Sequence, residues 1–220
     1  MKIVVTQRID LHKSRNEYRD SLDQKLIKLL VQLNHTPVPV PNSLVTSKED
    51  EKLIDWINNV KPTGLLISGG NDIGQYLNRD KTEETLYLWF LKNNFPILGI
   101  CRGMQILSVA HGGRMHQHLD TTPGHEGHGG FFGKSTEHGV VLEGDSQLAS
   151  IMGDSFIVNS LHHQGVSDSG SLDVSARADH DGLIEGVERK DKKFCLGVQW
   201  HPERKGHDLL FSALIEAARG

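Results

Sequence analysis

The segment from Pro96 to Gln105 constrains the fold of this chain more than any other. It reads PILGICRGMQ, so an apolar run leads directly into Cys101 and is followed by apolar residues at helical spacing. This pattern is typical of a buried strand that turns sharply into a helix. At such a turn the cysteine side chain is pushed out of the sheet, and the first N–H groups of the helix point toward it. The positive end of the helix dipole then favours the thiolate.

Cys101 therefore has two interpretations. It is either a nucleophile on a strained G-x-C-x-G elbow or an unreactive core cysteine, which is the usual environment of a free thiol. The other cysteine, Cys195, is flanked by Phe194 and Leu196, and we expect it to be inert core. Because the chain has only two cysteines, both in apolar runs, we expect no disulfide framework and a cytoplasmic location.

The first half of the chain alternates between strand and helix patterns. Strands are predicted at 3–5, 64–68 and 96–100, and 35–41 is extended but rich in proline, which suits an edge strand. Helices are predicted over 16–34, after a capping-box pattern at 47–50, from Asp80 with Glu83 onward, and after Cys101. Four such alternations predict a doubly wound, mainly parallel sheet with helices on both faces.

The second half changes character. Residues 111–138 are rich in glycine and histidine and predict a loop with short strand pieces. Short strands at 140–142, 156–158, 174–177 and 183–187 suggest an antiparallel addition to the sheet. A buried strand over 194–200 and a closing helix over 209–218 complete a single domain that spans 1–220, a length that suits one α/β core.

Overall charge and hydropathy exclude some classes of partner. The formal net charge is −4, which offers no general attraction to nucleic acid or to an anionic membrane surface. No apolar run approaches the roughly 18 residues that a membrane span needs. We therefore expect a small-molecule substrate, no nucleic acid and no membrane; a homo-oligomer is compatible with the sequence.

A candidate base and its orienting group follow the last predicted strand. A thiol nucleophile needs a base within hydrogen-bond reach, and a carboxylate normally orients that base. In an extended chain, residues two apart lie on one side, so Glu203 can orient His201. Backbone N–H groups at Arg102 and at Gly69 or Gly70 are candidate oxyanion donors. We also expect an exposed Arg102 side chain that raises the local positive potential. Taken alone, without Cys101, 200–203 would favour a strand end with a surface histidine over a catalytic pair.

Together these residues resemble the class I glutamine amidotransferase superfamily, and within it the γ-glutamyl hydrolase branch (cysteine peptidase family C26). The order and spacing match over nearly the whole chain. The matching segments are Ser68-Gly69-Gly70-Asn71-Asp72, Arg79-Asp80 with Glu83, Leu98 to Gln105, Gly112-Gly113, Val158 to Gln164, Asp181-Gly182 with Ile184-Glu185, and Gly197 to Glu203.

The resemblance implies a flavodoxin-like fold, a cofactor-free hydrolase and a specific set of site residues. It implies a catalytic triad of Cys101, His201 and Glu203, with the amides of Gly70 and Arg102 at the oxyanion hole. The remaining implied positions bind the glutamyl part of the substrate: Gly69, Gln105, Ser160, Leu161 and His162. The implied reaction is hydrolysis of a γ-glutamyl amide through a γ-glutamyl thioester, which releases glutamate and an amine or amidate.

One loop departs from the family pattern. Ser68 stands where the family usually has proline, Gly74 and Gln75 stand where a second proline is usual, and the segment from Asp72 to Arg79 is short. That loop rims the pocket in the family, so a short version leaves room for a bulky, charged leaving group. The chain is also similar to hydrolases that act on γ-glutamyl-CDP-amidate in capsule biosynthesis and release cytidine diphosphoramidate.

Two other functional classes compete with a free-standing hydrolase. The first is a glutaminase subunit that delivers ammonia to a separate synthase partner. The second is a binding or regulatory protein with silent chemistry, which the three filled triad positions disfavour. A metal site is not expected, because the histidines of 111–138 have neither helical H-x-x-x-H spacing nor a nearby cysteine. A pocket-lining role, with His116 or His125 touching substrate, fits them better.

Overall fold

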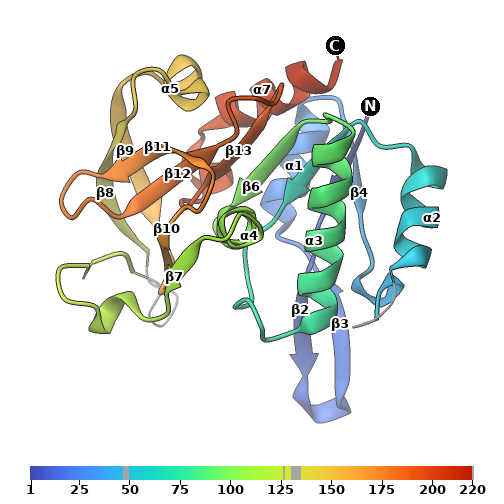
Figure 1. Ribbon diagram of the computed structural model, residues 1–220. Helices are drawn as coiled ribbons and strands as arrows, with labels where there is room; N and C mark the ends of the chain where they lie inside the picture. Colours follow the sequence, from blue (N-terminus) through green and yellow to red (C-terminus); the bar gives the residue numbers. More distant parts are fainter. Residues whose placement is uncertain (47–49, 126, 130–134, 220) are drawn as a thin grey trace.

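The computed structural model describes residues 1–46, 50–125, 127–129 and 135–219. Over these residues an eleven-stranded mixed sheet runs through the molecule (Figure 1). Five neighbouring strands are parallel and follow the order β4-β1-β5-β6-β13. In that order they span Thr36–Pro39, Lys2–Val5, Gly64–Ile67, Ile97–Ile100 and Cys195–Val198. Parallel neighbours need crossover connections, which the helices supply.

The other half of the sheet is antiparallel. It begins with β12 (Ile184–Glu188), which pairs with β13. The order then continues through β11, β8 and β9, which span Asp173–Ala178, Thr136–Leu142 and Ser155–Ser160. A branch is formed by β10 (Gly165–Asp168), which pairs with both β12 and β7 (Arg114–His116). The predicted parallel sheet with an antiparallel addition is confirmed.

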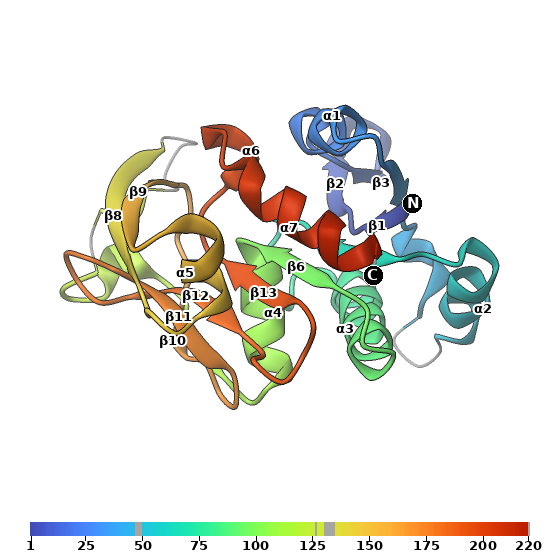
Figure 2. The same cartoon turned by 90° about the horizontal axis from the view of Figure 1, so that it is seen from above.

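Helices cover both faces of the parallel strands. Figure 2 shows α1 (Gln24–Gln32) and α7 (Asp208–Arg219) on one face, with α2 (Glu51–Val60), α3 (Leu77–Lys92) and α4 (Arg102–Ala110) on the other. Two short helices, α5 (Gln147–Met152) and α6 (Pro202–Lys205), lie near α7 in the same view. The remaining helical turns are 3₁₀ segments at Lys13–Arg15, Asn42–Leu44 and Leu119–Thr121.

The strand alternation builds two hydrophobic cores. In β1, Ile3 and Val5 belong to the core beneath α1 and α7, whereas Val4 belongs to the core beneath α2, α3 and α4. All three side chains are fully buried. Because successive side chains of a strand point to opposite faces, a strand covered on both sides is apolar throughout. This double burial explains the continuous apolar runs of β1, β5 and β6.

Some predicted element boundaries are wrong. Residues 16–34 are not one helix: Glu17–Ser21 is β3, which pairs with β2 (Arg8–His12) in a separate hairpin, and α1 begins only after its N-cap Asp23. Apolar residues at 18 and 22 fit either period, and the partner strand decided the outcome. The third helix begins at Leu77, before Asp80. The capping box falls on 47–50, of which 47–49 lie outside the described residues.

β7 is one of the short strand pieces predicted within 111–138. The sequence patterns do not predict β2, β10, α5 or α6. The partners of β10 are far away in the chain, as with β7. Among the described residues, no helix combines the length and the apolar character needed to cross a membrane.

Candidate active site

Cys101 lies at the sharp turn between β6 and α4. Its backbone has φ 54° and ψ −107°, which is rare for a residue with a side chain. Such strain persists only where surrounding packing imposes it. Two glycines permit that packing: a Cβ on Gly103 would lie 2.3 Å from the carbonyl oxygen of Ile67, and one on Gly99 would lie 2.7 Å from the carbonyl carbon of Gly103. The helix therefore packs directly against β5 and β6 and holds the elbow.

His201 and Glu203 make the predicted contact, although the predicted reason is wrong. His201 Nδ1 lies 2.7 Å from Glu203 Oε1. The chain is not extended here, because Pro202 begins α6 and Glu203 lies in its first turn. Proline is well suited to the first helical position. The helical turn brings the carboxylate to the imidazole, and both side chains are largely buried.

The imidazole of His201 interacts with the Cys101 thiol. Burial lowers the pKa of His201, but the charge of Cys101 and hydrogen bonds with Cys101 and Glu203 outweigh burial and raise it to about 10. These contacts therefore favour the protonated form of the imidazole. This electrostatic environment suits a thiolate–imidazolium pair.

The sequence patterns do not single out Gln199, yet it contacts the thiol. Its Nε2 lies 3.6 Å from Cys101 Sγ, and its Oε1 accepts a hydrogen bond of 3.2 Å from Gln105 Nε2. Gln105 also donates to the carbonyl oxygen of Gln164, at 3.3 Å. The available signal was a polar residue within an otherwise apolar run, since buried amides are retained where hydrogen bonds satisfy them.

The loop after β5 passes close to both catalytic candidates. A Cβ on Gly69 would lie 3.0 Å from His201 Cε1 and 3.4 Å from Cys101 Cβ. Gly70 has φ +102°, and a Cβ there would lie 3.0 Å from Arg8 Cβ. Both positions therefore favour glycine, and the loop backbone lies near the thiol. Arg102 is the first residue of α4, where N–H groups lack helical acceptors. The oxyanion assignment to Gly70 and Arg102 stays a prediction.

The Arg102 side chain is not exposed, contrary to the expectation. It is 1% exposed and forms ion pairs with Asp80 and Glu83 on α3. Burial lowers the pKa of Arg102, and Asp80 opposes that shift. Glu83 also bonds Arg79, at 3.0 Å. The helix that follows Cys101 turns this side chain into α3, so it anchors the elbow to that helix.

A cavity of about 300 Å³ opens at the carboxyl ends of β5, β6 and β13. In open α/β sheets ligands bind at this edge. Of the predicted site residues, those that line the cavity are Gly69, Gly70, Cys101, Arg102, Gln105, Leu161, His162, His201 and Glu203. Ser160 does not line it: the side chain is fully buried and donates from Oγ to the carbonyl oxygen of His128, at 2.5 Å.

The rim of the cavity carries charged side chains that the sequence patterns do not single out. Arg8 comes from β2 of the hairpin and Arg204 from α6. Arg8 lies 2.6 Å from Asp10, and Arg204 lies 3.1 Å from Asp23. Both arginines remain substantially exposed. The hairpin thus brings a cationic side chain to the site from a segment next to the one that the sequence predicts as helix.

Cys195 has the opposite environment. It is 1% exposed, and burial raises the pKa of its thiol to about 12. Its Sγ lies 4.0 Å from the Tyr87 hydroxyl. A thiol kept protonated in this way is unreactive, and its placement in the core is as predicted.

Comparison with known proteins identifies the family. The Peptidase C26 family model matches residues 3–203, which include β1, the elbow and the His201–Glu203 pair. The chain belongs to the Peptidase C26 family.

Two curated relatives and one solved structure illustrate the range of this C26 chain's similarity. The putative glutamine amidotransferase Rv2859c of Mycobacterium tuberculosis is 43% identical over 143 residues, 64% of this chain but only 46% of that protein. The γ-glutamyl-γ-aminobutyrate hydrolase PuuD of Escherichia coli K12 is 30% identical over 213 residues, 89% of this chain and 83% of that protein. The crystal structure of a putative GMP synthase subunit from Thermoplasma acidophilum has TM-score 0.69 and 18% identity. The match covers 100% of this chain and 94% of that one, and it establishes a shared fold.

Proposed function

We propose that this C26 chain is a hydrolase that cleaves γ-glutamyl amides through a thioester on Cys101. Membership of a peptidase family supports hydrolysis, and the name of PuuD supports a γ-glutamyl amide as the substrate class. One observation carries the proposal. Cys101 lies on a strained elbow that lines the cavity, and it interacts with the imidazole of His201, which Glu203 contacts at 2.7 Å.

The proposed reaction has two steps, formation of a thioester on Cys101 and its hydrolysis. The Cys101 thiolate attacks the γ-carbonyl carbon, and the His201 imidazolium gives its proton to the departing nitrogen as the C–N bond breaks. This step leaves a γ-glutamyl thioester and a neutral imidazole. His201 then takes a proton from water, whose oxygen attacks the thioester, and glutamate and the thiolate–imidazolium pair are released. Glu203 orients the imidazole throughout and stabilises its charged form.

The cavity wall supplies groups for the glutamyl part of the substrate. In both steps the negative oxygen faces the N–H groups of Gly70 and Arg102, a role supported by the place of Arg102 directly after Cys101 and by the place of Gly70 in the cavity lining. Gln105 and the backbone at Leu161 are proposed to hold the α-amino and α-carboxylate groups. Gln199 keeps the Gln105 amide in place through a hydrogen bond of 3.2 Å.

The leaving group is proposed to be anionic. The exposed guanidinium groups of Arg8 and Arg204 at the rim support this choice, because arginine recognises phosphate geometry. A nucleotide phosphoramidate such as the CDP-amidate group satisfies this requirement. A role in capsule biosynthesis follows only if that substrate is correct.

The test uses the purified chain alone. Glutamate release is measured from glutamine, γ-glutamyl-γ-aminobutyrate and a γ-glutamyl nucleotide phosphoramidate, with hydroxylamine added in parallel to trap the thioester as a γ-glutamyl hydroxamate. The proposal requires turnover and trapping with wild type and with Cys195→Ala, and neither with Cys101→Ala. If all substrates stay silent until a synthase is added, a glutaminase subunit replaces the free-standing hydrolase. The glutaminase subunit is the second candidate because the chain shares its fold with a putative GMP synthase subunit.

A further inference from the structure

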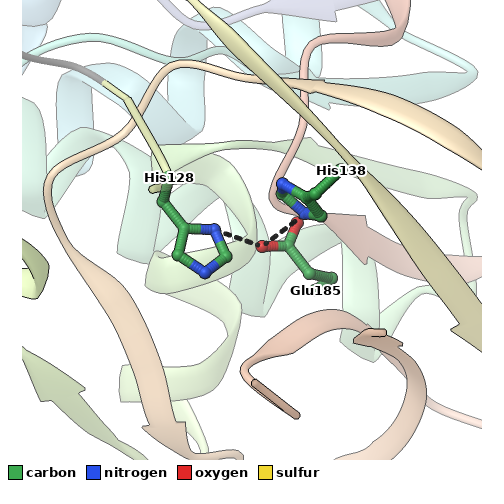
Figure 3. A group of neighbouring side chains, drawn as sticks. All are labelled: His128, His138 and Glu185. Atoms are coloured by element: carbon green, nitrogen blue, oxygen red, sulfur yellow. Dashed lines mark ion pairs between the residues drawn. The ribbon is translucent and has the colours of Figure 1, made fainter. Parts of the chain in front are cut away.

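A second cluster of ionisable side chains lies next to the cavity, and one of its members, His162, also lines the cavity. Glu185 on β12 is completely buried, and three imidazoles surround it: those of His128, His138 and His162. Figure 3 shows the rings of His128 and His138 pointing at the Glu185 carboxylate. None of these histidine side chains is more than 6% exposed. The mechanism proposed above does not use this cluster.

The contacts in this cluster are too long for hydrogen bonds between charged groups. Glu185 Oε1 lies 3.4 Å from His128 Nδ1, 3.5 Å from His138 Nε2 and 3.4 Å from His162 Nε2. Charge-assisted hydrogen bonds between nitrogen and oxygen are typically about 2.7–2.9 Å. No hydrogen-bond partner reaches any of these three nitrogens or either Glu185 oxygen within the described ranges. Four buried, polar side chains thus converge on one point without satisfying each other, which is costly.

The same distances match the edges of a zinc coordination tetrahedron. Zinc–nitrogen and zinc–oxygen bonds are about 2.0–2.1 Å, and the edge of a tetrahedron is about 1.63 times the centre-to-corner distance, so ligand atoms lie about 3.3–3.4 Å apart. The three measured oxygen–nitrogen distances agree with this spacing to within about 0.2 Å. These three distances are the edges that meet at Glu185 Oε1. Ligand atoms from His128, His138 and Glu185 all lie within 4.8 Å of one another, whereas His162 is outside that group and approaches it at Glu185.

Two of the three imidazoles have an outer partner of the kind that supports metal ligands. His128 Nε2 lies 2.8 Å from Asp181 Oδ2, and His162 Nδ1 lies 2.9 Å from the carbonyl oxygen of Gln164. A carbonyl oxygen can only accept, so it fixes a proton on His162 Nδ1. In the neutral ring the lone pair of Nε2 then faces Glu185. Metal-binding histidines almost always have such a carboxylate or carbonyl at the second nitrogen.

We propose that His128, His138 and Glu185 bind one zinc ion, and that His162, which approaches the same Glu185 oxygen, completes a closed, structural site. Four protein ligands leave no open position for water or substrate, which is the pattern of structural zinc. The ion would join β8, β12, the 127–129 segment and the segment after β9. His162 also lines the Cys101 cavity, so the ion would hold the cavity wall in place.

This site departs from the sequence-based expectation of no metal. The expectation rested on local histidine spacing, but the four ligands come from four separate segments. Only the pairing of β8 with β9 and of β11 with β8 and β12 brings them together.

A second set, His128, His180 and Asp181, competes for the same ion. It is a poorer candidate because Asp181 is already satisfied. Its Oδ1 accepts from the N–H of Leu183 at 2.9 Å, and its Oδ2 lies 2.8 Å from both His125 and His128. His180 is also 39% exposed. The inner set of four is therefore assigned.

The first experiment measures zinc in the full chain, purified without chelator or histidine tag. The chain is stripped with a chelator, dialysed with excess zinc and then with metal-free buffer, and analysed by mass spectrometry for metal. We expect about one tightly held zinc per chain, a higher melting temperature when it is loaded, and the visible spectrum of tetrahedral cobalt after exchange. Zinc at background level after loading, or an octahedral cobalt spectrum, overturns the proposal.

Variants locate the ion. Glu185→Gln and His138→Ala should lose the bound zinc, and Asp181→Asn should weaken its affinity by about 10–100-fold. His35→Ala is the matched control, because His35 is also buried with both ring nitrogens unpartnered, yet it lies elsewhere, after α1. Zinc that survives His138→Ala but is lost in His180→Ala assigns the ion to the outer set and overturns the inner one. If the variants fold poorly, the cobalt spectrum of the wild type still tests whether the site is tetrahedral. None of these readouts depends on the hydrolase activity.

Discussion

Arg79 Nη2 donates to the carbonyl oxygen of Gly69, at 2.9 Å, and to that of Ser68, at 3.1 Å. These bonds tie α3 to the loop that carries Gly70. Arg79 is itself fully buried and held by Glu83. The arginine thus fixes the backbone of the proposed oxyanion hole without touching the Cys101 thiol, which makes it a positioning residue.

Arg79→Lys should lower kcat about tenfold to a hundredfold with little change in KM. Lysine keeps the charge, but its single ammonium nitrogen cannot bond Glu83 and the two carbonyl groups from the separate positions that Nε and Nη2 of arginine occupy, and small displacements of catalytic groups cost rate. Steady-state kinetics on the best γ-glutamyl amide test this, with Arg19→Lys on the exposed hairpin as control. A rise in KM at unchanged kcat would show that Arg79 serves binding instead.

The two cysteines should respond in opposite ways to alkylation and substitution. Cys101→Ala should lower activity by several orders of magnitude while the fold persists, because the elbow accepts a small side chain. Cys195→Ala should retain nearly full activity. Peptide mapping after brief iodoacetamide treatment should find Cys101 modified first. Loss of activity that follows Cys195 modification would contradict the assignment.

Substitution of His201 should reduce activity more than substitution of Glu203. His201→Asn should stop both formation and hydrolysis of the thioester, since no group remains to transfer the proton. Glu203→Gln should be milder because it only loosens the orientation of the imidazole. Single-turnover kinetics with hydroxylamine trapping separate the two steps. Equal damage from both variants would assign Glu203 a direct chemical role.

The pH dependence follows from the raised pKa of His201. A group with a folded pKa near 10 and an ordinary value of 6.5 adds stability that is complete below about pH 6.5 and is lost as pH rises through 10. In the proposed mechanism the imidazolium also protonates the leaving group, so kcat/KM should fall over the same alkaline range. In Glu203→Gln both alkaline limbs should move to lower pH, because that carboxylate helps to raise the pKa. An unmoved limb in this variant, measured by kinetics and by melting temperature, would rule out that coupling.

Gly103→Ala should destabilise the fold by about 3 kcal/mol. Its Cβ would lie 2.3 Å from the carbonyl oxygen of Ile67, so α4 must shift away from β5. Gly144→Ala is the control, because nothing lies within 4 Å of a Cβ there. Urea unfolding of both variants measures the difference. Equal stability of the two would mean that α4 does not need close contact with the sheet.

Glutamine should be a poorer substrate than a phosphoramidate conjugate by kcat/KM. Ammonia is too small to contact Arg8 or Arg204, whereas the proposed anionic leaving group is expected to contact these cavity-lining arginines as the bond breaks. Arg204→Ala should therefore reduce kcat/KM for the conjugate and leave that for glutamine unchanged. An equal loss of kcat/KM for both substrates would mean that Arg204 supports the structure of the site and does not recognise the leaving group.

The helical crossovers and the elbow could be predicted because they depend on local pattern. Apolar runs that end in glycine or cysteine, followed by helical spacing, specify β5, β6 and α4 without knowledge of any partner. The order of motifs likewise specifies which residues meet at the carboxyl ends of the strands. His201 and Glu203 were found for this reason, even though the extended geometry assumed for them is wrong.

The remaining features depend on partners that are distant in sequence. Residues 17–21 carry a pattern that suits a helix, and only pairing with β2 makes them a strand. The Arg102 side chain follows the nucleophile directly, yet its carboxylate partners Asp80 and Glu83 lie about twenty residues earlier and draw it into the interior.

The sequence by itself thus determined the parallel core and the position of the nucleophile, because backbone period and glycine placement are local properties. Only the tertiary structure decided how Gln199 approaches Cys101 and how three histidines surround Glu185. Those contacts join segments that are distant in sequence, and the register of the strands that flank or carry these residues sets their geometry. A shift of one residue in that register would turn each side chain to the opposite face.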